Sequence, residues 1–255
     1  MFEIENKLNL SVIAVVLFCM LTTAYANEIE RVHIKEFSLK ADRSRLIVND
    51  SERGSLLTYE NPHDYPMLVQ TRIIKENKDG KSENFIATPP LFRLNEGQKN
   101  KVRIYKKDTK DLAKDRETLF WICSKGIPPT EKDVWAKEDI ESKKASQAVL
   151  GVTLAVENCI KLFYRPKGVP SVTFESGGDL VWTITNGKLK AYNPTPNYMN
   201  IKTILVNSLV VKSPEFISPF SEKVYDINVT SRENIEWSVI TDLGGTGKVH
   251  HEKIK

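Results

Sequence analysis

A long strand-like segment near the middle of the chain constrains the fold more than any other feature. The segment runs from Val149 to about Leu162, and from Leu150 to Val156 large aliphatic side chains occupy every second position with small residues between them. A period of two places alternate side chains on opposite faces of a β-strand, whereas a helix needs a period of ~3.6. Strands usually span ~5–6 residues. We therefore predict one over-long strand whose apolar face, here named the donor face, carries four residues: Leu150, Val152, Leu154 and Val156.

Shorter runs rich in β-branched and aromatic residues lie on both sides of this segment, and turn residues separate them. Such spacing is typical of β-sandwiches. The Pro- and Gly-containing stretch from Pro166 to Pro170 is the clearest break between two sets of runs, and 255 residues are enough for two domains. We predict an all-β fold with an N-terminal domain at 27–166, a linker at 167–170 and a C-terminal domain at 171–255.

The first 26 residues have the pattern of a secretory signal peptide. Lys7 precedes an apolar run at 10–21, and Ala24-Tyr25-Ala26 provides small residues at a cleavage site. The alternative is a membrane anchor, but the run is shorter than the ~20 residues that a spanning helix needs. We predict cleavage after Ala26, export from the cytoplasm and no membrane insertion.

Cleavage would remove Cys19 and leave Cys123 and Cys159. Two cysteines in an oxidising compartment favour one disulfide. A metal site would need further ligands, and none of the four histidines lies within a few residues of either cysteine. Between them, the turn residues at 125–129 are expected to break any strand, and the charged stretch at 131–147 is expected to form a solvated loop or a short helix.

Composition excludes several classes of protein. Hydrophobic residues make up 40% and charged residues 27%, which argues against a disordered, collagen-like or multi-span membrane chain. The net charge of +4 is too small and dispersed to indicate nucleic-acid binding. The histidines do not have metal-ligand spacing, and no G-x-S-x-G nucleophile motif occurs. We predict no enzymatic activity, no metal and no cofactor.

Five motifs carry a resemblance to a known family. They are Ala87–Leu94, Asp115–Trp121, Ile127-Pro128-Pro129, Ile160–Pro166 and Asn193-Pro194-Thr195-Pro196. In this order the motifs resemble the periplasmic pilus-assembly chaperones of the PapD-like family, and the similarity runs from about Asp42 to Gly245. The cysteine pair and the charged stretch are similar to the subfamily with a long F1–G1 loop.

The resemblance implies two immunoglobulin-like sandwiches in an L or boomerang arrangement with a cleft between them. It also implies a periplasmic chaperone that binds a fimbrial or capsule-like fibre subunit whose own sandwich lacks its last strand. The over-long strand would complete that sandwich by donor-strand complementation, with the donor face entering the subunit's groove. The subunit would then pass to an outer-membrane usher. An exposed apolar edge would favour self-capping of the free protein as a homodimer or higher oligomer.

Two basic residues of the family's cleft, which bind the subunit's C-terminal carboxylate, correspond to Arg45 and Lys161. Such an anchor would fix the register, because a slip of one residue turns every large side chain to the wrong face. The alternative is a pair of solvated surface charges.

The resemblance assigns two further groups of residues. An ion-pair network that fixes the angle between the domains corresponds to Glu117, Arg165 and Asp242. The subfamily's N-terminal edge strand, which also binds the subunit, corresponds to about Glu30–Leu39. Its candidate contact residues are Val32, Ile34 and Leu39, although an ordinary core strand explains them equally well.

The main rival is a secreted two-domain immunoglobulin-like adhesin that binds a host ligand. It would require exposed aromatic or polar loops rather than an alternating strand that ends in Lys161–Pro166. A secreted hydrolase is a more distant alternative, because the sequence lacks a recognisable nucleophile–base pair.

Overall fold

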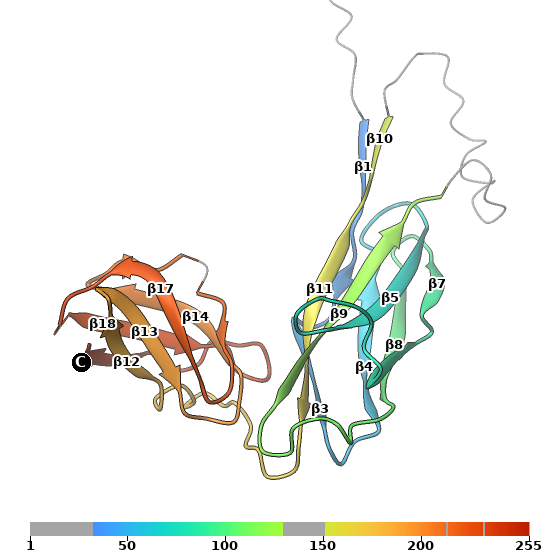
Figure 1. The fold of residues 1–255 in the computed structure, drawn as a ribbon. Coiled ribbons are helices and arrows are strands. Elements are labelled where there is room, and N and C mark those ends of the chain that lie inside the picture. Colours follow the sequence, from blue (N-terminus) through green and yellow to red (C-terminus); the bar gives the residue numbers. More distant parts are fainter. Residues whose placement is uncertain (1–32, 130–150, 213, 232, 255) are drawn as a thin grey trace, which may run out of the picture. The chain divides into compact units, whose positions relative to one another are not determined.

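The computed structural model describes residues 33–129, 151–212, 214–231 and 233–254. The regular elements in these ranges are all β-strands (Figure 1), which confirms the predicted all-β class. Within the same ranges no helix has the length and apolar character needed to cross a membrane. The predicted signal peptide, the charged stretch from residue 130 onward, Val32 and Leu150 lie outside the described residues.

The first group of strands forms two sheets around one apolar core. The five-stranded sheet has, in spatial order, β3 (Arg45–Asn49), β11 (Glu157–Arg165), β9 (Thr118–Ile127), β5 (Met67–Lys75) and β7 (Leu91–Leu94). The four-stranded sheet has β2 (Lys40–Ala41), β4 (Gly54–Glu60), β8 (Lys99–Lys106) and β6 (Phe85–Thr88). Alternate side chains of both sheets, such as Leu57 and Ile104 from one and Ile122 and Leu162 from the other, are fully buried in the core between them.

The second group of strands forms another sandwich with its own core. One sheet has β12 (Val181–Thr185), β13 (Lys188–Asn193) and β17 (Ser221–Asn228). The other has β15 (Leu209–Val210), β14 (Met199–Val206), β18 (Asn234–Val239) and β19 (His250–Lys253), and the short β16 (Phe216–Ile217) also pairs with β14. Trp182 and Trp237 pack in this core with their ring centroids 5.4 Å apart.

The predicted over-long strand is two strands, so the prediction of a single strand is wrong. The segment forms β10 (Gly151–Ala155) and β11, with a break at Val156. β10 pairs with β1 (His33–Phe37) in a two-stranded sheet, whereas β11 pairs with β9 and β3. At the break, the Val156 amide donates to the Phe37 carbonyl (3.4 Å) and its carbonyl accepts from Gly126 (3.1 Å). The chain therefore changes partners at Val156 while both of its backbone groups stay bonded.

The strand break predicted at 125–129 also begins later than expected. β9 continues to Ile127 and stops before Pro128. A side chain at Gly126 would place its Cβ only 2.3 Å from the Phe37 carbonyl oxygen. Glycine serves here for close backbone approach inside a strand, not for a turn.

Both sandwiches belong to one compact unit of the chain. The outer residues of the β1–β10 sheet, including 33–35 and 151–152, belong to a second unit. β11 ends at Arg165 and β12 begins at Val181, and the boundaries at 166 and 170 stay predictions.

Candidate functional site

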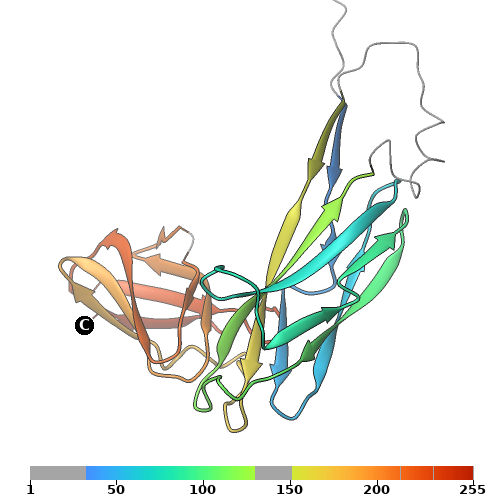
Figure 2. The same cartoon turned by 45° about the vertical axis from the view of Figure 1, so that its right-hand side comes forward.

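Parallel pairing brings Arg45 and Lys161 together. β11 runs parallel to β3, and the register places Lys161 opposite Arg45. Directly opposed residues on adjacent strands project to the same face of a sheet. Figures 1 and 2 show β11, in yellow, alongside β9, in green, from two directions. The two residues, here named the anchor pair, are therefore neighbouring cations although 115 residues lie between them in the sequence.

Arg45 is buried without a carboxylate partner. Only 7% of the residue is exposed, and one guanidinium nitrogen, Nη1, donates to the Ile240 carbonyl at 3.4 Å. Its Nε is buried and makes no hydrogen bond, and no acidic group among the described residues lies within salt-bridge distance. Burial lowers the pKa of Arg45, against the opposing influence of Asp242 and Glu117. Arg45 thus retains unused hydrogen-bonding capacity for an anion.

Lys161 has an equally unusual environment. Its ammonium donates to Asn200 Oδ1 at 2.6 Å and lies 4.9 Å from the centre of the Phe216 ring. Burial, together with the charges of Arg45 and Lys223, lowers the pKa of Lys161 to about 8 against the opposing influence of Glu215. Glu215 itself pairs with Lys223 at 2.6 Å. Solvated surface charges would not have these properties, so the surface alternative does not describe this pair.

An apolar cluster of residues from both sandwiches lies beside the anchor pair. Leu119 and Phe163 from the first sandwich are buried against Tyr198 from the second. The Phe163 and Tyr198 ring centroids are 5.6 Å apart. Trp121 and Phe216, which both lie near the Lys161 ammonium, pack against the same cluster. Apolar walls strengthen electrostatic interactions by excluding water.

The structure brings Glu117, Arg165 and Asp242 together, and we name them the ion-pair network. Arg165 contacts Glu117 Oε1 at 2.6 Å and Asp242 Oδ2 at 2.6 Å, and a second bond to Asp242 at 2.8 Å makes that contact bidentate. The acidic groups also accept backbone bonds, Glu117 from Tyr198 (2.8 Å) and Asp242 from Val172 (3.1 Å). All the charged groups therefore have partners.

The electrostatics of the network follow from its burial. Burial raises the pKa of Glu117 more than the Arg165 charge lowers it. Burial works against the charged form of Arg165 too, but hydrogen bonds and charge from Asp242 and Glu117 overcome it and raise the pKa of Arg165. A bidentate, doubly paired arginine of this kind joins residues from both sandwiches.

The donor face is accessible where the structure describes it. Leu154 on β10 is 47% exposed, and Val152 and Val156 are half-buried. A large aliphatic side chain that is half-exposed on a strand is available to a partner. Leu150 lies outside the described residues, as does Val32.

Of the other predicted edge-strand residues, Ile34 lies in β1. Leu39 lies outside β1 and is buried in the core of the first sandwich at 8% exposure. Its assignment as a contact residue is therefore wrong, and the ordinary core explanation applies to it.

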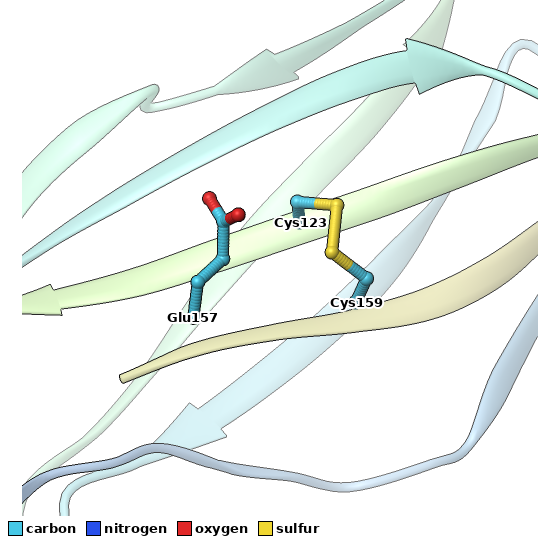
Figure 3. Close-up of side chains that lie close together, drawn as sticks. All are labelled: Cys123, Glu157 and Cys159. Carbon is cyan, nitrogen blue, oxygen red and sulfur yellow. A yellow bond between two sulfur atoms is a disulfide. The ribbon is translucent and has the colours of Figure 1, made fainter. Parts of the chain in front are cut away.

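The predicted disulfide between Cys123 and Cys159 is confirmed. Figure 3 shows the bond joining β9 and β11, with the Glu157 carboxylate beside it. The two cysteines are opposed in register, and their Cα atoms are 4.0 Å apart. Glu157 is also close enough to complete a three-ligand cluster, but both sulfurs are used in the disulfide and Glu157 pairs with Arg72 at 2.9 Å. The bond cross-links opposed positions of two adjacent strands.

Sequence reasoning missed the second sandwich's contribution to the anchor pair. Asn200 and Phe216 contact Lys161, and the Ile240 carbonyl contacts Arg45. Asn200 follows the Asn193–Pro196 motif closely, and a polar residue at a buried strand position was the available signal. The Ile240 contact uses a backbone group, which any residue would supply.

Two family models match the chain in succession. The model of the N-terminal domain of PapD, described as a pili and flagellar-assembly chaperone, matches residues 38–170. The model of the C-terminal domain of the pili assembly chaperone PapD matches residues 175–251. Together they cover both sandwiches.

Similar proteins extend over nearly the whole chain. The chaperone protein AggD of Escherichia coli is 38% identical over 240 residues, covering 93% of this chain and 94% of that protein. The chaperone protein caf1M of Yersinia pestis is 34% identical and covers 96% of this chain and 97% of its own.

Solved structures agree with these matches. The E. coli chaperone DraB has a TM-score of 0.75 at 37% identity, covering 88% of this chain and 100% of its own. The Salmonella enterica chaperone SafB, solved in complex with the SafA pilin, matches at 0.75 and 34% identity, covering 88% of this chain and 99% of the matched chain. On the combined evidence of both domain models, the relatives and the fold, the chain belongs to the PapD family of pilus-assembly chaperones.

Proposed function

We propose that this assembly chaperone holds a fibre subunit in the periplasm by two simultaneous contacts. The anchor pair binds the subunit's C-terminal carboxylate, and the donor face fills the groove left by the subunit's missing strand. The chaperone then delivers the subunit to an outer-membrane usher. The same proposal includes export from the cytoplasm, cleavage of the signal peptide after Ala26 and a long loop between β9 and β10.

The observation that carries the proposal is the pairing of Arg45 with Lys161 in a site where, among the described residues, no carboxylate forms a salt bridge with either cation. Placing two cations side by side away from water is costly unless an anion joins them. A terminal carboxylate has two oxygens, which suit one guanidinium and one ammonium. The anchor pair therefore favours a carboxylate that comes from another molecule.

The donor face supplies the apolar part of the contact. Full burial of a Val or Leu side chain contributes ~1.5–3 kcal/mol, so four residues would give roughly 6–12 kcal/mol before the cost of association. Leu154 is 47% exposed and is therefore available for this contact. Because the carboxylate sets the register, each aliphatic side chain would meet its own position in the groove.

The relatives support the choice of partner. SafB, which is 34% identical to this chain, was solved in complex with the SafA pilin. We infer a fibre subunit as the partner here as well. The rival adhesin hypothesis is not favoured, because the matched relatives are named as chaperones. The proposed action includes no covalent step, and the two cysteines, being disulfide-bonded, offer no thiol nucleophile.

Co-expression of the chaperone with the fibre subunit from its own gene cluster tests the anchor pair. We expect Arg45→Ala and Lys161→Ala each to weaken co-purification by about 30-fold or more, because loss of one charge from a desolvated contact costs about 2–5 kcal/mol. Lys167→Ala, at an exposed position six residues along, serves as the matched control. Wild-type subunit levels with both anchor variants would refute the proposal.

The donor face has its own test. Leu154→Asp should leave the chaperone folded but abolish co-purification, because a carboxylate would enter an apolar groove. Leu209→Asp is the control, since Leu209 is 68% exposed on β15 of the other sandwich. Circular dichroism establishes that both variants fold, and equal capture by the two would contradict the donor role.

A further inference from the structure

Asn200 on β14 connects to both members of the anchor pair. The residue is only 3% exposed, and its Oδ1 accepts from the Lys161 ammonium at 2.6 Å. Its backbone carbonyl accepts from the Ile240 amide at 2.7 Å, and the Ile240 carbonyl in turn accepts from Arg45. One buried residue of the second sandwich therefore supports Lys161 directly and Arg45 through the backbone of one residue, Ile240.

The orientation of the Asn200 amide is set by its other end. Nδ2 donates to the Tyr198 carbonyl at 3.1 Å. Tyr198 is itself held by its own amide, which donates to Glu117, and by its hydroxyl, which donates to Glu76 at 3.0 Å. A flipped amide would place NH₂ against the ammonium and oxygen against a carbonyl, so both contacts would be lost. Only one orientation satisfies both groups.

The neutrality of this amide matters as much as its position. An ammonium has three donors, and Asn200 takes the one protein hydrogen bond that Lys161 Nζ makes within the described part of the chain. The carboxylate that raises the pKa of Lys161 is that of Glu215, which is paired with Lys223. Asn200 thus fixes the ammonium and leaves two donors and the full charge unused.

We propose that Asn200 is a positioning residue for subunit capture. Its neutral amide orients the Lys161 ammonium toward the incoming carboxylate without neutralising the charge. This inference rests on the proposed function of the anchor pair. It predicts that aspartate at position 200, which has nearly the same shape as asparagine, will weaken binding of the subunit. A carboxylate there would pair with Lys161 internally and compete with the subunit.

The direct test is the pKa of Lys161, measured from the NMR shifts of its Cε and Nζ during a pH titration of the free chaperone. Asn200→Asp should raise that pKa by about 1 unit or more, since an opposite charge within hydrogen-bonding distance favours the charged form. Asn228→Asp, at an exposed position on β17, adds the same charge elsewhere and should leave it unchanged. An unchanged pKa in Asn200→Asp would overturn the inference.

A binding test then separates this inference from the proposed function. Synthetic peptides of the subunit's C-terminal residues are made with a free terminal carboxylate and with a terminal amide. Asn200→Asp should lower the affinity for the acid peptide about tenfold or more, which is the equivalent of one pKa unit of lost interaction. It should change the affinity for the amide peptide little. Asn200→Ala should cause a smaller loss of affinity for the acid peptide, because it removes the group that orients the Lys161 ammonium but adds no competing charge.

The outcomes differ for the two ideas. If the wild-type chaperone does not prefer the acid peptide over the amide, the carboxylate anchor itself is wrong. If the wild type prefers the acid peptide and Asn200→Asp keeps the same preference, the anchor stands and the role of Asn200 is wrong. Equal losses for both peptides in both variants would indicate a structural role only, and would also overturn the inference.

Discussion

Strand β11 carries two basic side chains, Lys161 and Arg165, whose surroundings are opposite. Their spacing of four residues places both on the same face of the strand. Arg165 is enclosed by Glu117 and Asp242, each within 2.6 Å. Lys161 instead lies beside another cation, Arg45, and its hydrogen-bond partner is a neutral amide. One strand thus presents a satisfied charge and an unsatisfied one.

The difference separates a structural charge from a binding charge. Removing a charge from water is costly, and partners within the fold offset that cost for Arg165. The anchor pair has no salt-bridge partner among the described residues, and on the proposed function an external carboxylate offsets most of its cost. Stability lost in the free chaperone thereby becomes affinity for a carboxylate. The comparison predicts that substitutions at the two positions will affect different measurements.

The largest effect on stability is expected at Arg165. Arg165→Met would leave the buried Glu117 carboxylate without its guanidinium, and breaking a buried pair typically costs about 3–5 kcal/mol. Urea unfolding monitored by tryptophan fluorescence measures the change. Arg116→Met is the control, because Arg116 forms an exposed pair with Asp115 and its loss should have no measurable effect. A similar small effect at Arg165 would remove the basis of the comparison.

Lys161→Met should change stability much less, by less than about 1 kcal/mol. Relief from burying an unpaired ammonium favours the variant, whereas the orphaned Asn200 oxygen opposes it by a comparable amount. The same unfolding measurement applies, alongside capture of the subunit, which should be lost. A destabilisation as large as that of Arg165→Met would mean that Lys161 is a structural charge after all.

Subunit capture should depend on pH through Lys161. The pKa of this group is lowered to about 8, mainly by burial, and a carboxylate binds its protonated form. Capture should therefore be strongest below pH ~8 and weaken as pH rises through that value, by at most about tenfold per pH unit for one linked proton. Lys161→Arg, which stays charged, should bind with little pH dependence over the same window.

The stability of the free chaperone should move in the opposite direction. Between pH ~8 and ~10.5 the unfolded chain binds a proton at Lys161 that the folded chain has released, so the free energy of unfolding contributed by this group rises with pH. Between pH ~8 and ~10.5, this contribution to the free energy of unfolding should rise in the wild type while subunit capture weakens. Parallel curves would contradict the assignment of the transition to Lys161.

Much of this molecule could be predicted from local patterns. The all-β class and the disulfide were accessible from period and composition, whereas the residues of the anchor pair and the ion-pair network came from the family resemblance. The break at Val156 was not, because both halves of the segment have the same period of two and only their partner strands differ. The position of Gly126 inside β9 could not be predicted for a similar reason. Glycine is needed there because the Phe37 carbonyl, from a segment far away in the sequence, approaches closely.

The amino-acid sequence by itself determined which segments extend, where the chain turns and which side chains carry charge, because these depend on neighbouring residues. Only the tertiary structure decided that Arg45 lies opposite Lys161, that Asn200 holds the ammonium and that Arg165 is neutralised while the anchor pair is not. Charge–charge distances and burial depend on strands far apart in the chain, and these quantities set the cost of a buried charge.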